Sequence, residues 1–216
     1  MRVDMHIHSI YSSDGTMEIK EILKLAKKIG LGAIAITDHN EIRGALKARE
    51  MKILPVIRGI EVSSSEGHIL AYGVDCKIPR DLGIQETIER IRECGGIAVA
   101  AHPYRYWSGL REGNVKKFQF DAIEVLNGRC KQRANKRAKK LCEELNKPFT
   151  AGSDAHFPDE IGRAGLIVES ENEEEILDMI MKKKVSVFGT SRGKLATLRY
   201  VKKAVSGWMM RGFKRI

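Results

Sequence analysis

Short apolar segments alternate with amphipathic segments of helical period along most of this chain. Residues 32–37 form a continuous apolar run, which is typical of a parallel strand that is covered on both faces. Before this run, residues 19–29 carry apolar side chains at helical spacing, and Gly30 follows where a helix would end. The alternation predicts an α/β fold of about seven strand–helix units.

The same pattern places the other elements. Strands are expected near 3–7, 32–37, 55–60, 97–101, 121–125, 148–151, 165–168 and 185–188, and helices near 19–29, 40–50, 82–93, 131–145 and 171–182. This order fits either a barrel or an open doubly wound sheet, and the first strand is not followed by the glycine fingerprint of a dinucleotide fold. At 216 residues, one domain is the default.

The net charge of +10 is concentrated at the C-terminal end of the sequence. After Asp178 there are eleven basic residues and no acidic one, so residues 1–178 hold 27 basic and 28 acidic residues. We expect a domain over 1–190 and a basic amphipathic helix over 191–216. That helix either packs its apolar face on the domain, guides an anionic chain to the site, or anchors on anionic lipid.

The absence of a recognisable targeting signal and the spacing of the cysteines lead us to expect a cytoplasmic protein. No apolar run approaches the roughly 18 residues of a membrane span, and the pattern of a signal peptide is missing. The four cysteines show no C-x-x-C spacing, and Cys94 and Cys142 fall on apolar helix faces. Buried thiols are therefore expected rather than disulfides.

All six histidines lie at or near places where an apolar run gives way to a polar or Gly/Pro turn. On a strand, the first two would point the same way, as two ligands of one metal ion must. Carboxylates stand near most of the others. A metal cluster at one end of a sheet would produce this distribution; the histidines are His6, His8, His39, His68, His102 and His156.

The order of these motifs resembles the PHP (polymerase and histidinol phosphatase) family. Asp-x-His-x-His-Ser opens the chain, and Ser-Asp-Gly, Thr-Asp-His, Gly-x-Glu, Ala-His-Pro and Gly-Ser-Asp-Ala-His follow. The match spans about residues 1–165. It implies a distorted seven-stranded (β/α)7 barrel of TIM-like type, with functional groups gathered at the strand ends.

The resemblance also implies two or three divalent metal ions. The first would be held by His6, His8, Glu61 and Asp154, the second by Glu61, His68 and His102, and the third by Asp14, His39 and His156. Some members carry histidine where Asp14 stands. Catalytic roles fall to Glu61, Asp154 and His156, while Asp4 and Asp38 are expected to orient imidazoles by hydrogen bonds.

Imidazole and carboxylate ligands without thiolates suit Zn, Mn or Fe. Such ions activate water and neutralise phosphate oxygens, so hydroxide bound to metal attacks phosphorus. Arg105, Arg129 and Arg163 each follow a motif closely and are candidates for binding the phosphate.

The expected protein is a PHP-type phosphoesterase acting on a nucleotide, a short oligonucleotide or another phosphorylated small molecule. Histidinol-phosphate phosphatase is the alternative enzyme. A non-catalytic RNA-binding subunit, like the barrel protein of ribonuclease P, is the alternative from another class. The sequence leaves the oligomeric state open.

Overall fold

The structure is a computed structural model that describes residues 1–191. The expected basic helix over 191–216 lies, apart from its first residue, outside the described part of the chain. None of the helices within residues 1–191 is long and apolar enough to cross a membrane.

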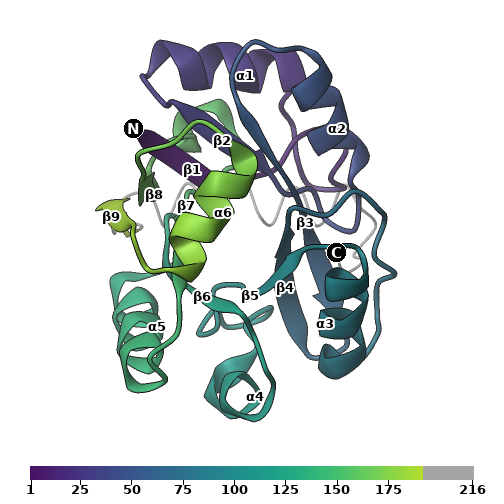
Figure 1. Ribbon diagram of the computed structural model, residues 1–216, viewed down its shortest axis with the longest axis vertical. Coiled ribbons are helices and arrows are strands. Elements are labelled where there is room, and N and C mark those ends of the chain that lie inside the picture. The colour runs from purple at the N-terminus through teal and green to yellow at the C-terminus, as the bar shows by residue number, and fades with distance from the viewer. Residues whose placement is uncertain (192–216) are drawn as a thin grey trace.

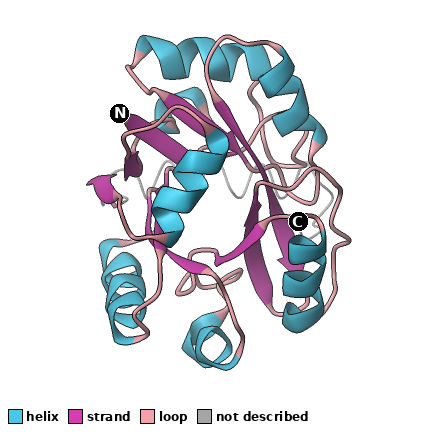
Figure 2. Cartoon of the chain, viewed as in Figure 1, coloured by secondary structure: helices cyan, strands magenta, loops and turns pink. Residues whose placement is uncertain are grey.

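One strongly curved sheet organises the described residues (Figures 1 and 2). Its strands follow the order β7-β6-β5-β4-β3-β2-β1-β8-β9. They are β1 (Arg2–Ile7), β2 (Ala33–Ile36), β3 (Val56–Ser64), β4 (Gly67–Tyr72), β5 (Ile97–Ala100), β6 (Ala122–Asn127), β7 (Phe149–Gly152), β8 (Ala164–Ile167) and β9 (Ser186–Gly189).

The sheet nearly closes between β1 and the end of β7. Ile7 forms a parallel bridge with Ala155, and the N–H of His8 donates to the Ala155 carbonyl over 2.8 Å. Gly152 lies so close to β1 that a Cβ atom there would stand 2.3 Å from the Cβ of His6. The predicted α/β barrel is therefore present in its general form.

The strand count differs from the predicted seven, because residues 1–191 contain nine strands and not all are parallel. β3 and β4 form an antiparallel hairpin, with Glu61 opposite Leu70 and Ser63 opposite His68. β4 also runs antiparallel to β5, and β8 runs antiparallel to β1 and β9. The sequence pattern missed β4 because its apolar residues follow β3 with no helix between them.

Helices cover the outside of the curved sheet (Figure 1). They are α1 (Ile19–Lys28), α2 (Arg43–Glu50), α3 (Ile84–Glu93), α4 (Arg111–Lys117) and α5 (Gln132–Glu144), while α6 (Glu173–Met181) lies across the opening of the barrel. Five of the six agree with the expected segments. The pattern missed α4, whose seven residues include Gly113 and bury only Val115.

Two buried clusters stabilise this arrangement. One joins the helices to the outer face of the sheet, and it includes Ile22 and Leu23 of α1. The other contains residues from every strand between β1 and β8 together with Ile176 and Ile180 of α6, so it is the barrel interior. Burial of these apolar side chains is the main force that holds the strand ends in place.

A β-bulge interrupts the pairing of β1 with β2. Asp4 lies opposite Ile34 and Ile7 lies opposite Ile36, so β1 has one more residue over this stretch than β2. Met5 belongs to the barrel interior, whereas Ile7 belongs to the outer cluster. A bulge of this kind re-aims the side chains that follow it.

The cysteines differ in part from the expected free thiols. Cys130 and Cys142 are free and buried, as expected for cysteines used as small apolar side chains. Cys76 and Cys94 instead form a disulfide between the segment after β4 and the end of α3. The spacing of the two residues along the chain gave no indication of this pair.

Candidate metal centre

The ends of the strands bring nine potential ligand side chains together. β1, with its following residues, supplies two histidines, and the segments after β2, β5 and β7 supply four further ligands. The hairpin β3–β4 and the loop after β1 supply the rest. The nine are His6, His8, Asp14, His39, Glu61, His68, His102, Asp154 and His156, and every one except Asp14 and His68 is buried.

The first group consists of His6, His8, Glu61 and Asp154, whose ligand atoms all lie within 4.8 Å of one another. The Nε2 atoms of His6 and His8 are 3.1 Å apart, and each is 3.1 Å from Oε2 of Glu61. Two imidazole nitrogens face each other closely only with a proton or a cation between them. The geometry is that of a cation site.

Glu61 also faces a second set of imidazoles with its other oxygen. Oε1 lies 2.8 Å from Nδ1 of His68 and 2.7 Å from Nε2 of His102. Glu61 therefore directs one oxygen toward each set, as a carboxylate that bridges two ions does. His39 lies near the same carboxylate, with its Nε2 atom 3.5 Å from Oε2, the oxygen that faces His6 and His8.

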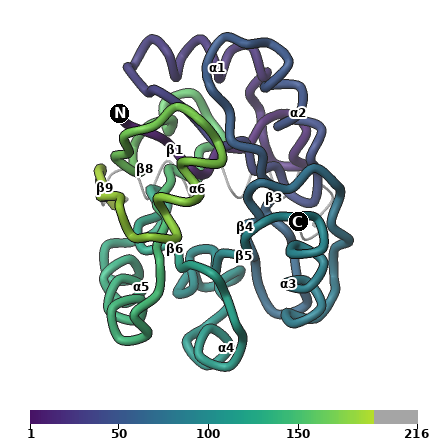
Figure 3. Tube along the Cα trace, viewed as in Figure 1, coloured from purple at the N-terminus to yellow at the C-terminus, as the bar shows by residue number. Residues whose placement is uncertain are grey.

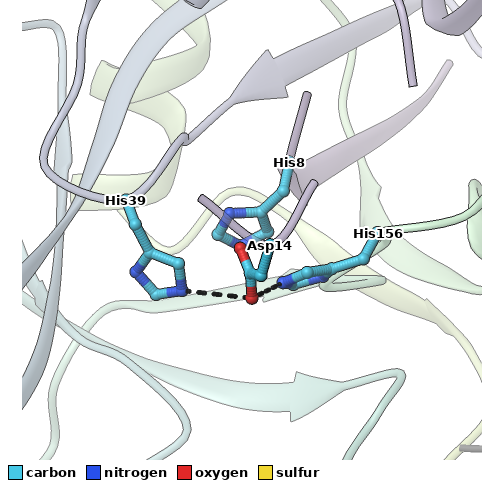
Figure 4. A group of neighbouring side chains, drawn as sticks. All are labelled: His8, Asp14, His39 and His156. Atoms are coloured by element: carbon cyan, nitrogen blue, oxygen red, sulfur yellow. Dashed lines mark hydrogen bonds and ion pairs between the residues drawn. The ribbon is translucent and has the colours of Figure 1, made fainter. Parts of the chain in front are cut away.

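A third group surrounds Asp14 (Figure 4). Oδ2 of Asp14 lies 2.6 Å from Nε2 of His156 and 3.9 Å from Nε2 of His39. His8 completes this group as well as belonging to the first, and the His8 and His156 rings are 4.1 Å apart. The expected three sets are therefore neighbours that share residues.

Protonation states in this cluster favour metal binding. Burial alone would raise the pKa of Glu61, but the imidazoles of His39 and His6 hold it well below the ordinary value. Burial lowers the pKa of His39 and of His102. Carboxylates that stay charged and imidazoles that stay neutral are the forms that bind metal ions. The exception is His6, whose pKa rises despite burial because Glu61 and Glu124 lie beside it.

Unsatisfied atoms support the same conclusion. Among the buried side chains of residues 1–191, Nδ1 of His102 and Oδ1 of Asp154 have no hydrogen-bond partner. Buried polar atoms are normally paired, so an unpaired carboxylate oxygen facing imidazoles fits a site for a cation. The donor set suits divalent metal ions.

Two of the potential ligands also adopt an unfavourable backbone conformation. His102 has φ = 26° and Asp154 has φ = 56°, both in the left-handed region. Such conformations in residues other than glycine persist where the surrounding structure imposes them, and they gather at functional sites.

The residues that orient the imidazoles differ from those expected. Asp4 accepts from the backbone N–H groups of Ser153 and Gly162, both at 2.8 Å. Asp38 accepts from the N–H and hydroxyl of Ser9, at 2.6 and 2.7 Å. These two aspartates thus fix the loops that carry the ligands and not the rings. Burial raises the pKa of each to about 6.

Glu124, which the sequence analysis left without a role, contacts a ring directly. Its Oε1 atom lies 2.9 Å from Nδ1 of His6, and its Oε2 atom accepts from the N–H of His102 at 2.8 Å. Nδ2 of Asn127 donates to the same Oε2 atom over 3.1 Å. The available signal was a single acidic residue inside the apolar strand β6.

The three candidate arginines occupy different places. Arg105 donates to Oδ2 of Asp154 over 2.5 Å, and Nη1 of Arg129 lies 2.5 Å from Nδ1 of His156. Both guanidinium groups therefore lie at the cluster. The side chain of Arg163 pairs with Asp159 on the surface instead.

Comparisons with known proteins relate this chain to the PHP family. A family model described as PHP-associated matches residues 132–185. An uncharacterised protein of Methanocaldococcus jannaschii is 36% identical over 140 residues, which are 59% of this chain and 82% of that protein. A 3',5'-nucleoside bisphosphate phosphatase of Chromobacterium violaceum is 32% identical over 98 residues, or 42% of this chain and 33% of the phosphatase.

A solved structure extends the similarity to the fold. A two-domain Bacteroides vulgatus protein containing a PHP-like metal-dependent phosphoesterase superposes with a TM-score of 0.72 at 20% identity. The match covers 88% of this chain and 64% of that one. The chain belongs to the PHP family, and it shares its fold with a PHP-like metal-dependent phosphoesterase.

Proposed function

We propose that this protein is a metal-dependent phosphoesterase that hydrolyses the phosphate ester of a nucleotide or a short oligonucleotide. The observation that supports this most directly is the position of Glu61. It directs one oxygen toward His6 and His8 and the other toward His68 and His102. A buried carboxylate between two sets of imidazoles is the arrangement needed to hold two cations side by side.

Each part of the chain has a distinct task in this proposal. Divalent ions, when bound, supply an activated water and neutralise the charge that develops on the phosphate. Glu61 and Asp154 contribute negative charge that holds these ions. His156 completes the third group with Asp14, and its other nitrogen faces Arg129.

Arg105 and Arg129 are suited to the phosphate. A guanidinium group binds two phosphate oxygens at once through paired N–H donors. Arg105 is 22% exposed, and Arg129 is buried beside His156. A phosphate at the cluster would therefore have one guanidinium toward solvent and one toward the interior, whereas the pairing of Arg163 with Asp159 makes it the weaker candidate.

The convergence of nine potential ligand side chains argues against a non-catalytic RNA-binding subunit. Such a protein would have no use for nine converging ligands. The similarity to a nucleoside bisphosphate phosphatase favours nucleotides, and histidinol phosphate remains the alternative substrate.

A phosphate-release screen tests the proposal. Purified protein loaded with Mn²⁺, Zn²⁺ or Fe²⁺ should release phosphate from nucleotides or short RNA faster than from histidinol phosphate or other amino-alcohol phosphates. Glu61→Gln should abolish release and lower the metal content per chain while the circular dichroism spectrum stays unchanged. Glu66→Gln, an exposed position in the turn of the same hairpin, is the matched control. Wild-type turnover and metal content in Glu61→Gln would refute the role of Glu61.

A further inference from the structure

Two large aromatic side chains lie exposed in the segment between β5 and α4. Trp107 is 87% exposed and Tyr106 is 70% exposed, which makes them the most exposed large apolar residues in the described part of the chain. Their rings meet edge to face, with centroids 4.7 Å apart. A side chain of this size gains most of its stabilisation from burial, so an exposed pair calls for a binding partner.

The segment that carries them leads from β5 to α4 (Figure 3), and hydrogen bonds join it to residues of the candidate metal centre. It begins at His102, one of the expected ligands, and the N–H of Arg105 donates to the His102 carbonyl over 2.8 Å. The N–H of His68, another expected ligand, donates to the carbonyl of Ser108 over 3.0 Å. The aromatic pair is thus flanked on both sides by residues bound to the cluster.

The segment is also tightly folded. The N–H of Gly109 donates to the Arg105 carbonyl over 3.1 Å, and the N–H of Arg111 donates to the Pro103 carbonyl over 3.0 Å. A Cβ atom at Gly109 would stand 2.6 Å from the carbonyl oxygens of Pro103 and Arg105. The aromatic rings are therefore held by a compact turn.

Positive charge surrounds the pair. The guanidinium of Arg105, one residue before Tyr106, reaches Asp154 in the cluster. That of Arg111 lies 5.8 Å from the centre of the Tyr106 ring and donates to the Tyr106 carbonyl. Tyr106 is thus supported by Arg111, whereas Trp107 presents the more open ring.

We propose that Trp107, supported by Tyr106, stacks on the nucleobase of a substrate whose phosphate lies at the metal cluster beside Arg105. Every nucleobase has a flat π-face, and aromatic side chains bind such faces with little dependence on base identity. This inference rests on the proposed phosphoesterase function. It identifies Trp107 and Tyr106 as the residues by which the protein distinguishes a nucleotide from a base-free phosphate ester.

Two substrates that differ only in the base provide the kinetic test. Trp107→Ala should reduce kcat/KM for adenosine 5'-phosphate about 5- to 150-fold, mainly through KM. The same variant should leave kcat/KM for ribose 5-phosphate unchanged, and Trp107→Phe should retain most of the activity on the nucleotide. Met181→Ala, which removes an exposed apolar side chain from α6, is the matched control.

Assays on a dinucleotide show which base stacks on Trp107: the base of the nucleotide that carries the reacting phosphate, or the base of its neighbour. An equal effect of Trp107→Ala on mononucleotide and dinucleotide assigns stacking to the base attached to the reacting phosphate. An effect on the dinucleotide alone assigns it to the neighbouring nucleotide. Equal losses on adenosine 5'-phosphate and ribose 5-phosphate would overturn the proposal, because the residue would then act on the site itself.

Fluorescence gives a measurement that does not depend on turnover. The chain has two tryptophans, so Trp208→Phe leaves Trp107 as the single emitter. In the metal-loaded protein, a nucleoside phosphonate, in which a methylene group replaces the ester oxygen, should quench this emission, and methylphosphonate should not. Equal responses to both phosphonates would refute base stacking even if phosphate esters are hydrolysed.

The failure of the proposed function gives a different result. If no phosphate ester is hydrolysed but the nucleoside phosphonate alone still quenches Trp107, the base site stands and the reaction assignment fails. Analytical ultracentrifugation of the wild type and of Trp107→Ala tests whether a second copy of the chain binds this surface instead. A dimer in the wild type that is lost in the variant, with unchanged kinetics on both substrates, would make the aromatic pair a contact between copies and overturn the proposal.

Discussion

Glu124 determines which nitrogen of His6 is available to a metal ion. A carboxylate can only accept hydrogen bonds, so the 2.9 Å contact places the proton of His6 on Nδ1. In the neutral imidazole, Nε2 is then left with its lone pair facing His8 and Glu61. The hydrogen bond from the imidazole to a carboxylate also raises the basicity of the ligand.

Glu124→Gln should reverse this arrangement. Its amide oxygen can still accept from the N–H groups of His102 and Asn127, which now share Oε2. The amide NH2 group would then face Nδ1 of His6, which must become an acceptor and move its proton to Nε2. The proton would occupy the position where the metal ion binds.

The expected loss of metal affinity follows from the changed hydrogen bond between residue 124 and Nδ1 of His6. Removing a carboxylate that orients a metal-bound histidine typically lowers metal affinity about 10- to 100-fold, or about 1.4 to 2.8 kcal/mol. Competition with a chromophoric chelator measures the affinity for Zn²⁺, and the ¹⁵N chemical shifts of the His6 ring report the tautomer. Glu144→Gln, an exposed position on α5, should change neither. Glu124→Gln with wild-type affinity and an unchanged tautomer would refute the role of Glu124.

Two further predictions concern the metal ions and the packing of the site. Activity should disappear with chelator and return with Mn²⁺, Zn²⁺ or Fe²⁺ rather than Mg²⁺, because imidazole-rich sites favour softer ions; full activity in Mg²⁺ alone would contradict the ligand set. Gly152→Ala should lower the free energy of unfolding by about 1–3 kcal/mol, since its Cβ atom would overlap His6. Chemical denaturation measures this loss, and Gly113→Ala, whose Cβ atom would meet no atom within 4 Å, should show no such loss.

The sequence was most informative where the chemistry is local. Alternating apolar segments indicated most strands, and the residues just after them supplied the ligand candidates that the structure brings together. Pairing between distant segments was beyond such patterns. Glu124 meets His6 across 118 positions of sequence, and Cys76 meets Cys94 between two separate segments. No periodicity reports contacts of this kind.

The missed strand has a different cause. The run Ser-Ser-Ser-Glu-Gly, which extends from the end of β3 to the start of β4, contains residues typical of turns, so a hairpin signal was present. The expectation of a regular strand–helix alternation outweighed it. This hairpin places Glu61 and His68 on adjacent strands, so the departure from a regular barrel is part of the site.

The extra residue in β1 separates two tasks that one strand would otherwise share. Before the bulge, Val3 and Met5 fill the barrel interior, and the hydroxyl of Tyr72 donates to the Met5 carbonyl over 2.6 Å. After the bulge, His6 and His8 belong to the ligand cluster. Two residues, Met5 and His6, occupy the stretch of β1 for which β2 has only Ala35, so deletion of either would remove an interior side chain or a ligand. The bulge thus lets one strand place an interior side chain and a ligand side chain at successive positions.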